Sequence, residues 1–236
     1  MKNKINQFLD IHKNEIVDNL CKLVKIESIS KKDENFVYGK NSAAALEFCL
    51  NLAKEKNLST QNHEYICGEV MLNKVCDKKR LVIASHCDVV ECDDDNIYPN
   101  FYGEVVNNYV VGRGVVDDKG PLIATLYALA FFKENNIPIK NDIRLLFGCN
   151  EENGMDDIFY YLDKVGQPDL GLAVDDDFPV VCGEKGLIRF TISCPKANCV
   201  EYIKSNGKNL RLIDDVCLAK IDEKELTYKR TSIKSN

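Results

Sequence analysis

The sequence predicts an α/β fold in which a mostly parallel β-sheet lies between two layers of helices. Two short, continuous apolar runs, at residues 81–85 and 143–147, are typical of strands that are buried on both faces. Residues 171–174 form a third and shorter run. A strongly apolar helical pattern separates the first two runs, and strands that alternate with helices are typical of this three-layer architecture.

Three segments are predicted to be helices. Residues 3–26 carry apolar side chains at roughly helical spacing, and residues 41–58 have a mostly apolar face. The third helix begins at Pro121, whose missing N–H costs nothing in a first helical turn, and Asn135 marks its end. We expect these helices to cover the sheet.

The pattern changes near residue 187. Residues 187–193 alternate like a half-exposed strand, residues 198–207 predict one short helix, and residues 216–221 predict one more strand. This β-α-β stretch is typical of the opening of a second domain. We therefore predict a first domain over residues 1–186 and the start of a second over residues 187–236.

Charge and composition exclude several classes of partner. Lys and Arg number 31 against 37 Asp and Glu, which gives a net charge of −6, and there is no basic stripe that would bind nucleic acid. The first twenty residues are charged throughout, unlike a secretory signal, and no apolar stretch approaches the length of a transmembrane helix. We therefore expect a cytoplasmic protein without a nucleic-acid or membrane partner.

The eleven cysteines are scattered and include no Cys-x-x-Cys pair. This spacing argues against a structural zinc ribbon and against a thioredoxin-type dithiol. We expect free thiols that serve as small apolar side chains in a reducing compartment. Cys87 and Cys149 lie beside acidic motifs, where oxidation would harm a site.

Four acidic islands carry the candidate chemistry. They are residues 85–88 (Ser-His-Cys-Asp), 112–121 (Gly-Arg-Gly-Val-Val-Asp-Asp-Lys-Gly-Pro), 150–152 (Asn-Glu-Glu) and 175–177 (Asp-Asp-Asp). Three of them follow predicted strands, and ligand sites of open α/β sheets lie beyond the carboxyl ends of the strands. One imidazole with several carboxylates is a plausible ligand set for Zn²⁺, with Mn²⁺ or Co²⁺ as substitutes.

Within the islands, spacing suggests roles. On an extended segment His86 and Asp88 point to the same side, so Asp88 could accept the second ring N–H of His86. Glu151 and Glu152 are adjacent, so one can bind a metal while the other acts as a base. Each island also has a simpler explanation: Asp117 and Asp118 as a helix N-cap, and the others as solvated turns. Their joint occurrence at strand ends favours a metal site.

The ordered motifs resemble those of a known enzyme family. His-x-Asp-Val-Val, Gly-Arg-Gly-x-x-Asp-Asp-Lys-Gly-Pro, Asn-Glu-Glu-x-Gly and Asp-x-x-Phe-Pro-Val, with a following Gly-Glu-Lys-Gly, occur in this order. The sequence resembles the di-zinc exopeptidases of the aminoacylase, carnosinase and succinyl-diaminopimelate desuccinylase family, and most of all the PepV-like bacterial dipeptidases. The resemblance covers roughly residues 3–190, and residues 112–121 are its most specific part.

The resemblance implies a zinc-exopeptidase-like catalytic domain with two Zn²⁺ ions, an inserted α+β lid domain and a dipeptide or acylated amino acid as substrate. It also implies a role for each matching residue. His86 and Asp175 would bind the first metal, Asp117 would bridge both metals, Glu152 would bind the second metal, Glu151 would be the general base and acid, and Asp88 would support His86. A water between the metals would attack the scissile carbonyl, and Glu151 would return its proton to the leaving amine.

Departures from the family pattern leave alternatives open. Members of the family are longer, and a final histidine ligand comes from a later segment, whereas His12 and His63 of this protein lie upstream of the motifs and match none of them. The catalytic domain is therefore expected to be incomplete at its C-terminal end, with an uncovered sheet edge that favours self-association or a complementing C-terminal segment. One alternative is a catalytically impaired fragment that binds one metal or none. Another is a deacylase or desuccinylase.

Overall fold

The computed structural model describes residues 1–73, 78–92, 96–176, 180–183, 200–205, 216–221 and 224–229. The chain divides into two compact units, Met1–Cys182 and Gly183–Asn236. Each unit is described by itself. The predicted boundary between residues 186 and 187 lies outside the described residues.

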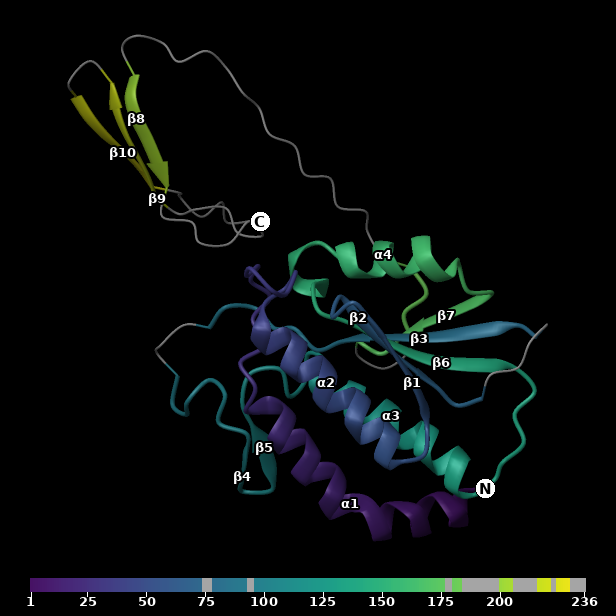
Figure 1. The fold of residues 1–236 in the computed structure, drawn as a ribbon. Coiled ribbons are helices and arrows are strands. Elements are labelled where there is room, and N and C mark those ends of the chain that lie inside the picture. Colours follow the sequence, from purple (N-terminus) through teal and green to yellow (C-terminus); the bar gives the residue numbers. More distant parts are fainter. Residues whose placement is uncertain are drawn as a thin grey trace, which may run out of the picture. The chain divides into compact units, whose positions relative to one another are not determined.

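The first unit is built around one five-stranded mixed sheet with the strand order β1-β2-β6-β3-β7 (Figure 1). Its pairings β3–β6 and β3–β7 are parallel, whereas β1–β2 and β2–β6 are antiparallel. The sheet is therefore parallel only in the half that carries the acidic islands. The strand bounds are β1 Ser59–His63, β2 Cys67–Met71, β3 Arg80–His86, β6 Asp142–Gly148 and β7 Leu170–Ala173.

Helices lie on both faces of this sheet, as the three-layer prediction requires (Figure 1). Helices α1, α2 and α3 share one face and enclose the larger apolar core, whereas α4 packs over the opposite face with a smaller core around Tyr161. The four helices are α1 Lys2–Val24, α2 Lys40–Glu55, α3 Lys119–Glu134 and α4 Asp156–Val165. The three predicted helices and three predicted strands are thus confirmed to within a few residues at each end.

Two hairpins were not predicted. One is β1–β2, which is rich in polar residues and extends the sheet on its antiparallel side. The other joins β4 (Glu104–Val106) to β5 (Tyr109–Val111) through Asn107 and Asn108, both with positive φ. Asparagine tolerates that conformation, and a two-residue turn of this kind matches the twist of the flanking strands.

The second unit contains a three-stranded antiparallel sheet in the order β10-β9-β8. Its strands are β8 Val200–Ser205, β9 Val216–Ile221 and β10 Lys224–Lys229. The strand predicted at 216–221 is confirmed, but the helix predicted over 198–207 is wrong, because β8 occupies most of that range. Val200, Tyr202 and Ile203 are β-branched or aromatic and favour a strand that can pair with β9. The strand predicted over residues 187–193 lies outside the described residues.

Among the residues that the structure describes, no helix has both the length and the apolar character that crossing a membrane requires.

A buried ionic network holds the antiparallel half of the sheet to α4. Glu69 of β2 is 3% exposed and accepts hydrogen bonds from Arg144 of β6 (2.8 Å) and from the hydroxyl of Tyr161 on α4 (2.5 Å). His63 lies 3.3 Å from the same carboxylate. Burial opposes ionisation, but these hydrogen bonds and the Arg144 charge outweigh it and lower the pKa of Glu69 to about 2.

This network predicts an acid-sensitive contribution to stability. The carboxylate of Glu69 stabilises the folded state above its unfolded pKa of 4.5, and the contribution is lost as the pH falls through about 2. The difference between the unfolded and folded pKa values of Glu69 corresponds to roughly 3 kcal/mol of stability. Glu69→Gln should therefore lower the free energy of unfolding by about that amount at pH 7 and by about half as much at pH 3.

Urea unfolding followed by circular dichroism at the two pH values measures this difference. The exposed Glu55→Gln serves as the control and should change the free energy of unfolding by less than about 0.5 kcal/mol at either pH. A destabilisation by Glu69→Gln that is the same at pH 7 and pH 3 would contradict the ionic role of Glu69.

Candidate metal centre

The parallel pairing of β3 with β6 and β7 brings three of the acidic islands to one edge of the sheet. His86 is the last residue of β3 and is paired with Gly148, so the turn that carries Glu151 follows at the same edge. On the other side of β3, strand β7 ends at Ala173, two residues before Asp175. Residues that are far apart in the sequence therefore meet where the parallel strands end.

The fourth island forms the loop that leads into α3. Gly114 has a φ of +85°, and a Cβ there would lie 2.8 Å from a methyl group of Val89. Because both the conformation and the space exclude a side chain, glycine lets the loop pack against the end of the first island. The loop then places Asp117 and Asp118 beside His86, and the peptide bond between the two aspartates is cis.

Lys119, from the same island, is a structural residue. Its side chain is fully buried, and Nζ donates hydrogen bonds to the carbonyl oxygens of Leu23 (3.2 Å) and Ile26 (2.8 Å) at the end of α1. Burial lowers the pKa of Lys119 to about 8. The lysine therefore ties the metal-site loop to the end of the N-terminal helix by a second hydrogen bond to each of two carbonyls that also accept backbone N–H groups.

His86 lies at the centre of the site and is 1% exposed. Its Nε2 atom lies 3.0 Å from Oδ1 of Asp117, 3.5 Å from Oδ2 of Asp175 and 4.0 Å from Oε2 of Glu151. The three carboxylates come from three different segments of the chain. The carboxylates of three residues predicted from the sequence therefore face the same ring atom of His86.

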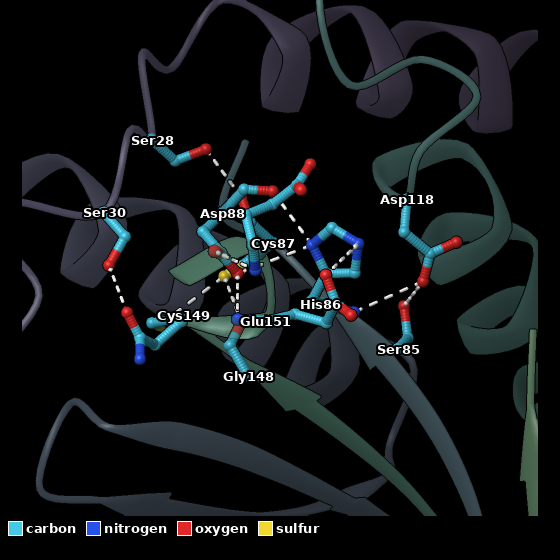
Figure 2. Close-up of polar contacts among 12 residues, drawn as sticks. Ser28, Ser30, Ser85, His86, Cys87, Asp88, Asp118, Gly148, Cys149 and Glu151 are labelled. Carbon is cyan, nitrogen blue, oxygen red and sulfur yellow. Dashed lines mark hydrogen bonds and ion pairs between the residues drawn. The ribbon is translucent and has the colours of Figure 1, made fainter. Parts of the chain in front are cut away.

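Asp88 joins the ends of the two central strands. Its side chain is fully buried, and one carboxylate oxygen accepts the backbone N–H of Glu151 at 3.2 Å (Figure 2). The other carboxylate oxygen accepts the backbone N–H of Glu152, also at 3.2 Å. Nδ1 of His86 lies 3.0 Å from the carbonyl oxygen of Asp88 and 3.4 Å from its carboxylate. Asp88 thus orients both the imidazole and the Glu151 turn, and its burial keeps it from touching a substrate.

Asp118 is a site residue that the motifs did not single out as a ligand. It occupies the N-cap position of α3 but makes no capping hydrogen bond with its side chain. The carboxylate instead accepts hydrogen bonds from the hydroxyl of Ser85 (2.5 Å) and from the backbone N–H of His86 (3.2 Å) (Figure 2). One ligand atom each from His86, Asp118 and Asp175 lies within 4.8 Å of the others. The sequence did contain a signal for Asp118, because it is the second aspartate of the Asp-Asp-Lys-Gly motif.

The groups around His86 carry an excess of negative charge. Burial disfavours the imidazolium, but hydrogen bonds to Asp175 and Asp88 outweigh it and raise the pKa of His86 to about 12. Burial, reinforced by the charge of Asp175, raises the pKa of Asp118 to about 7. Burial and the charges of Asp175 and Glu152 likewise raise the pKa of Glu151, against the attraction of His86. A cation is the group that relieves this repulsion.

The residues present fit a divalent metal ion. Oδ1 of Asp118 is buried and has no hydrogen-bond partner among the described residues, which is costly for a carboxylate oxygen unless a cation binds it. His86, Asp118 and Asp175 supply one nitrogen and carboxylate oxygens, the donor types that Zn²⁺ accepts.

Glu152 is placed differently from the other predicted ligands. It belongs to the short 3-10 turn Glu151–Asn153, and its backbone is held by Asp88. In the described residues the cluster with metal-ligand spacing consists of His86, Asp118 and Asp175, without Glu152. Its assignment to a second metal therefore stays a prediction.

A second layer of contacts holds the turn after β6 in place. Asp157 at the start of α4 accepts the backbone N–H of Asn150 at 2.7 Å, and a Cβ at Gly148 would collide with the same carboxylate. Ser30, between α1 and α2, donates its hydroxyl to the side-chain oxygen of Asn150 at 2.9 Å (Figure 2). The position of Glu151 therefore depends on contacts from elements on both faces of the sheet.

The cysteines beside the islands are packing residues. Cys87 and Cys149 are both fully buried, and their sulfur atoms lie 3.6 Å apart without a disulfide bond (Figure 2). The hydrogen bond with Cys87, together with burial, raises the pKa of the Cys149 thiol well above its usual value. Neutral thiols behave as small apolar groups, in agreement with the prediction from the sequence.

The other two histidines lie in contacts of their own. His12 on α1 lies within hydrogen-bond distance of Glu15 and Glu134, and His63 on β1 contacts Glu69. His86 is therefore the only one of the three histidines of this protein that reaches the site.

Comparison with known proteins decides the family. Residues 82–214 match the family described as "Peptidase family M20/M25/M40". The chain belongs to this peptidase family. The matched segment contains all four acidic islands.

Relatives with similar sequences include a protein of Staphylococcus epidermidis named "Putative dipeptidase", which is 33% identical over 184 residues. That alignment covers 77% of this chain and 39% of the relative. A Bacillus subtilis protein named "Putative dipeptidase YtjP" is 29% identical over 193 residues, which cover 78% of this chain and 41% of the relative. The chain thus spans about two fifths of the length of these relatives.

Solved structures show the same fold. Human carnosine dipeptidase 1 superposes with a TM-score of 0.63 at 20% identity, over 75% of this chain and 41% of that protein. The dipeptidase Dug1p from Saccharomyces cerevisiae gives a TM-score of 0.57 at 18% identity, over 69% of this chain and 37% of that protein. At these identities the likeness supports the zinc-exopeptidase-like fold that the motifs predicted.

The contacts of Asp88 predict an effect on metal affinity without direct contact to the metal. In Asp88→Asn one of the two accepting oxygens becomes an amide N–H₂ that faces a backbone N–H, so the turn at Glu151 and the ring of His86 should both shift. We expect Zn²⁺ affinity to fall about 10- to 100-fold, measured by competition with a chromophoric chelator.

Asp163→Asn, a matched change on the exposed face of α4, should leave the affinity unchanged. Equal Zn²⁺ affinities for Asp88→Asn and the unaltered protein would show that Asp88 does not position the ligands.

Proposed function

We propose that this chain is a metal-dependent peptidase that hydrolyses dipeptides. The observation that carries the proposal is the convergence of Asp117, Glu151 and Asp175 on Nε2 of His86 at the end of the parallel strands. Glu151 is half-buried beside these residues and does not belong to the cluster of His86, Asp118 and Asp175 that has metal-ligand spacing. Its carboxylate is therefore free to act as a base. Membership of the M20/M25/M40 family and the names of the relatives support the same activity.

In this proposal His86, Asp118 and Asp175 hold one divalent ion, which is Zn²⁺ in the first instance and Mn²⁺ or Co²⁺ as substitutes. Asp117 faces the same ring atom of His86 and is 62% exposed, so it is available to a second ion. Glu152 would bind the same second ion. The proposal therefore includes a second metal ion beside the first.

A metal bound there supplies Lewis acidity for the scissile carbonyl and for the attacking water. Glu151 acts as the base: its carboxylate takes a proton from the water while the oxygen attacks the carbonyl carbon. It then gives that proton to the leaving amine as the C–N bond breaks. Burial and nearby negative charge raise the pKa of Glu151, which strengthens it as a base relative to an exposed glutamate.

A second candidate function is a catalytically impaired protein that holds one ion. The observation in its favour is that His12 and His63 are engaged elsewhere, so the sequence offers one imidazole to the site. Deacylase and desuccinylase activity on acylated amino acids needs the same chemistry at the carbonyl. These activities differ from dipeptidase activity in the group that is removed from the amino acid.

A cytoplasmic location, predicted from the sequence, stays part of the proposal and agrees with the free thiols of the described residues.

Replacing Glu151 by alanine tests the proposed chemistry. Because Glu151 moves the proton while other residues bind the ion, Glu151→Ala should lower kcat for dipeptide hydrolysis about 10²- to 10⁴-fold and leave the metal content unchanged. Hydrolysis is followed by release of free amino acids, and metal content by elemental analysis of the same samples. Glu55→Ala on α2 is the matched control and should retain full activity.

The outcomes separate the candidates. Full activity in Glu151→Ala would contradict the role of Glu151. Absence of hydrolysis in the unaltered protein, with one ion per molecule, would favour the single-ion candidate. Hydrolysis of N-acetyl or N-succinyl amino acids in preference to dipeptides would favour a deacylase or desuccinylase.

A further inference from the structure

Residues 28–30, in the connection between α1 and α2, lie against the first acidic island. The backbone N–H of Val89 donates to the carbonyl oxygen of Ser28 at 3.1 Å. The buried hydroxyl of Ser28 donates to the carbonyl oxygen of Cys87 at 2.6 Å (Figure 2). Because Cys87 and Val89 flank Asp88, these two hydrogen bonds fix residues 28–30 against the island that orients the imidazole.

Ser30 connects the same segment to the third acidic island. Its hydroxyl donates to the side-chain oxygen of Asn150 at 2.9 Å, and its carbonyl oxygen accepts the side-chain amide of Asn153 at 3.4 Å (Figure 2). Asn150 and Asn153 stand directly before and after the pair Glu151-Glu152. Ser30 therefore holds both ends of the short turn that carries the proposed base.

Asn150 is the residue through which Ser30 reaches Glu151. Asn150 is 5% exposed, and its backbone N–H donates to the carboxylate of Asp157 at 2.7 Å. Its carbonyl oxygen accepts the backbone N–H groups of Asn153 (3.3 Å) and Met155 (2.9 Å). These bonds fix the backbone of Asn150, and the hydroxyl of Ser30 fixes its side chain. Since Glu151 is the next residue, a shift of Asn150 would displace the Glu151 carboxylate.

We propose that Ser30 is a positioning residue for the general base, and that it acts by holding Asn150 so that the Glu151 carboxylate stays 4.0 Å from Nε2 of His86. The inference rests on the proposed peptidase function and adds to it a residue outside the four acidic islands. A base must lie within hydrogen-bond reach of the proton that it takes, and a misplacement of about 1 Å can lower a rate up to about 100-fold. The residues with metal-ligand spacing come from other segments, so Ser30 should affect turnover and not metal binding.

Removing and restoring the hydroxyl of Ser30 tests this role. Ser30 is half-buried, so Ser30→Ala changes the packing little, and we expect kcat for alanyl-alanine to fall about 10-fold while KM and zinc content stay unchanged. Ser30→Thr keeps a hydroxyl at the same position and should retain most of kcat. The exposed Ser59→Ala on β1 is the matched control and should behave like the unaltered protein.

A double-mutant cycle tests whether the effect passes through Asn150. Asn150→Ala removes the oxygen that accepts the hydroxyl of Ser30, so adding Ser30→Ala to Asn150→Ala should cause no further fall in kcat. A further fall as large as the one that Ser30→Ala causes alone would overturn the proposal, because Ser30 would then act by another route.

Hydrogen exchange of the backbone N–H groups of residues 150–155 makes the test independent of turnover. Loss of one hydrogen bond should make this exchange about 5-fold faster in Ser30→Ala, whereas Ser30→Thr should exchange like the unaltered protein. Faster exchange in Ser30→Ala, with no hydrolysis by the unaltered protein, would contradict the proposed function and support the placement of the turn by Ser30.

Two further results would overturn the proposal. One is full kcat in Ser30→Ala. The other is a fall in kcat that is accompanied by a loss of zinc, because Ser30 would then support the whole site and not the position of the base.

Discussion

One buried carboxylate, that of Asp88, connects the two strand ends on which the site depends. It holds the turn after β6 through the backbone N–H groups of Glu151 and Glu152, and it lies against the ring of His86 at the end of β3. A buried carboxylate is stable only where its oxygens are satisfied, so the position of Asp88 and the conformation of the turn require each other. The distance between His86 and Glu151 follows from this mutual requirement and from the parallel register of the strands.

The same constraint explains why negative charge accumulates on one side of the imidazole. With Nδ1 of His86 directed towards Asp88, Nε2 points to Asp117, Asp175 and Glu151. Hydrogen bonds to Asp175 and Asp88 raise the pKa of His86, and burial raises the pKa of Asp118, with the charge of Asp175 as a smaller contribution. One buried oxygen of Asp118 has no hydrogen-bond partner among the described residues. In the proposed function a divalent ion would offset the negative charge of these carboxylates, and Glu151 would move the proton.

Sequence patterns were sufficient for the half of the fold that carries the site. Strands β3 and β6 are apolar enough to be recognised, and the glycines and aspartates of residues 112–121 mark the loop between them. The β1–β2 hairpin was missed because β1 is polar and because Gly68 and Glu69 interrupt the apolar residues of β2. Residues 198–207 were predicted to be a helix because the pairing of Val200–Ser205 with β9 is a long-range effect that local periodicity does not contain. Tertiary contacts, not intrinsic preference, decide the secondary structure of such segments.

At the site, the sequence indicated the residues whose carboxylates face Nε2 of His86, but it could not tell the different environments of Asp117 and Asp118 apart. Their difference is one of burial: Asp117 is largely exposed, whereas Asp118 is enclosed with Ser85 against β3. That burial is set by the packing of the loop on α1 and on Val89, through Lys119 and Gly114, and adjacent identical residues carry no sequence signal for it.

The proposed function requires a metal ion that is bound by His86 and Asp118 at the carboxyl end of β3. The most direct measurement is a crystal structure of the protein grown with Zn²⁺, with anomalous diffraction recorded on both sides of the zinc absorption edge. We expect an anomalous peak within about 2.0–2.2 Å of Nε2 of His86 and of a carboxylate oxygen of Asp118. A zinc peak elsewhere, with His86 still hydrogen-bonded to the carboxylates and Oδ1 of Asp118 still without a partner, would contradict it.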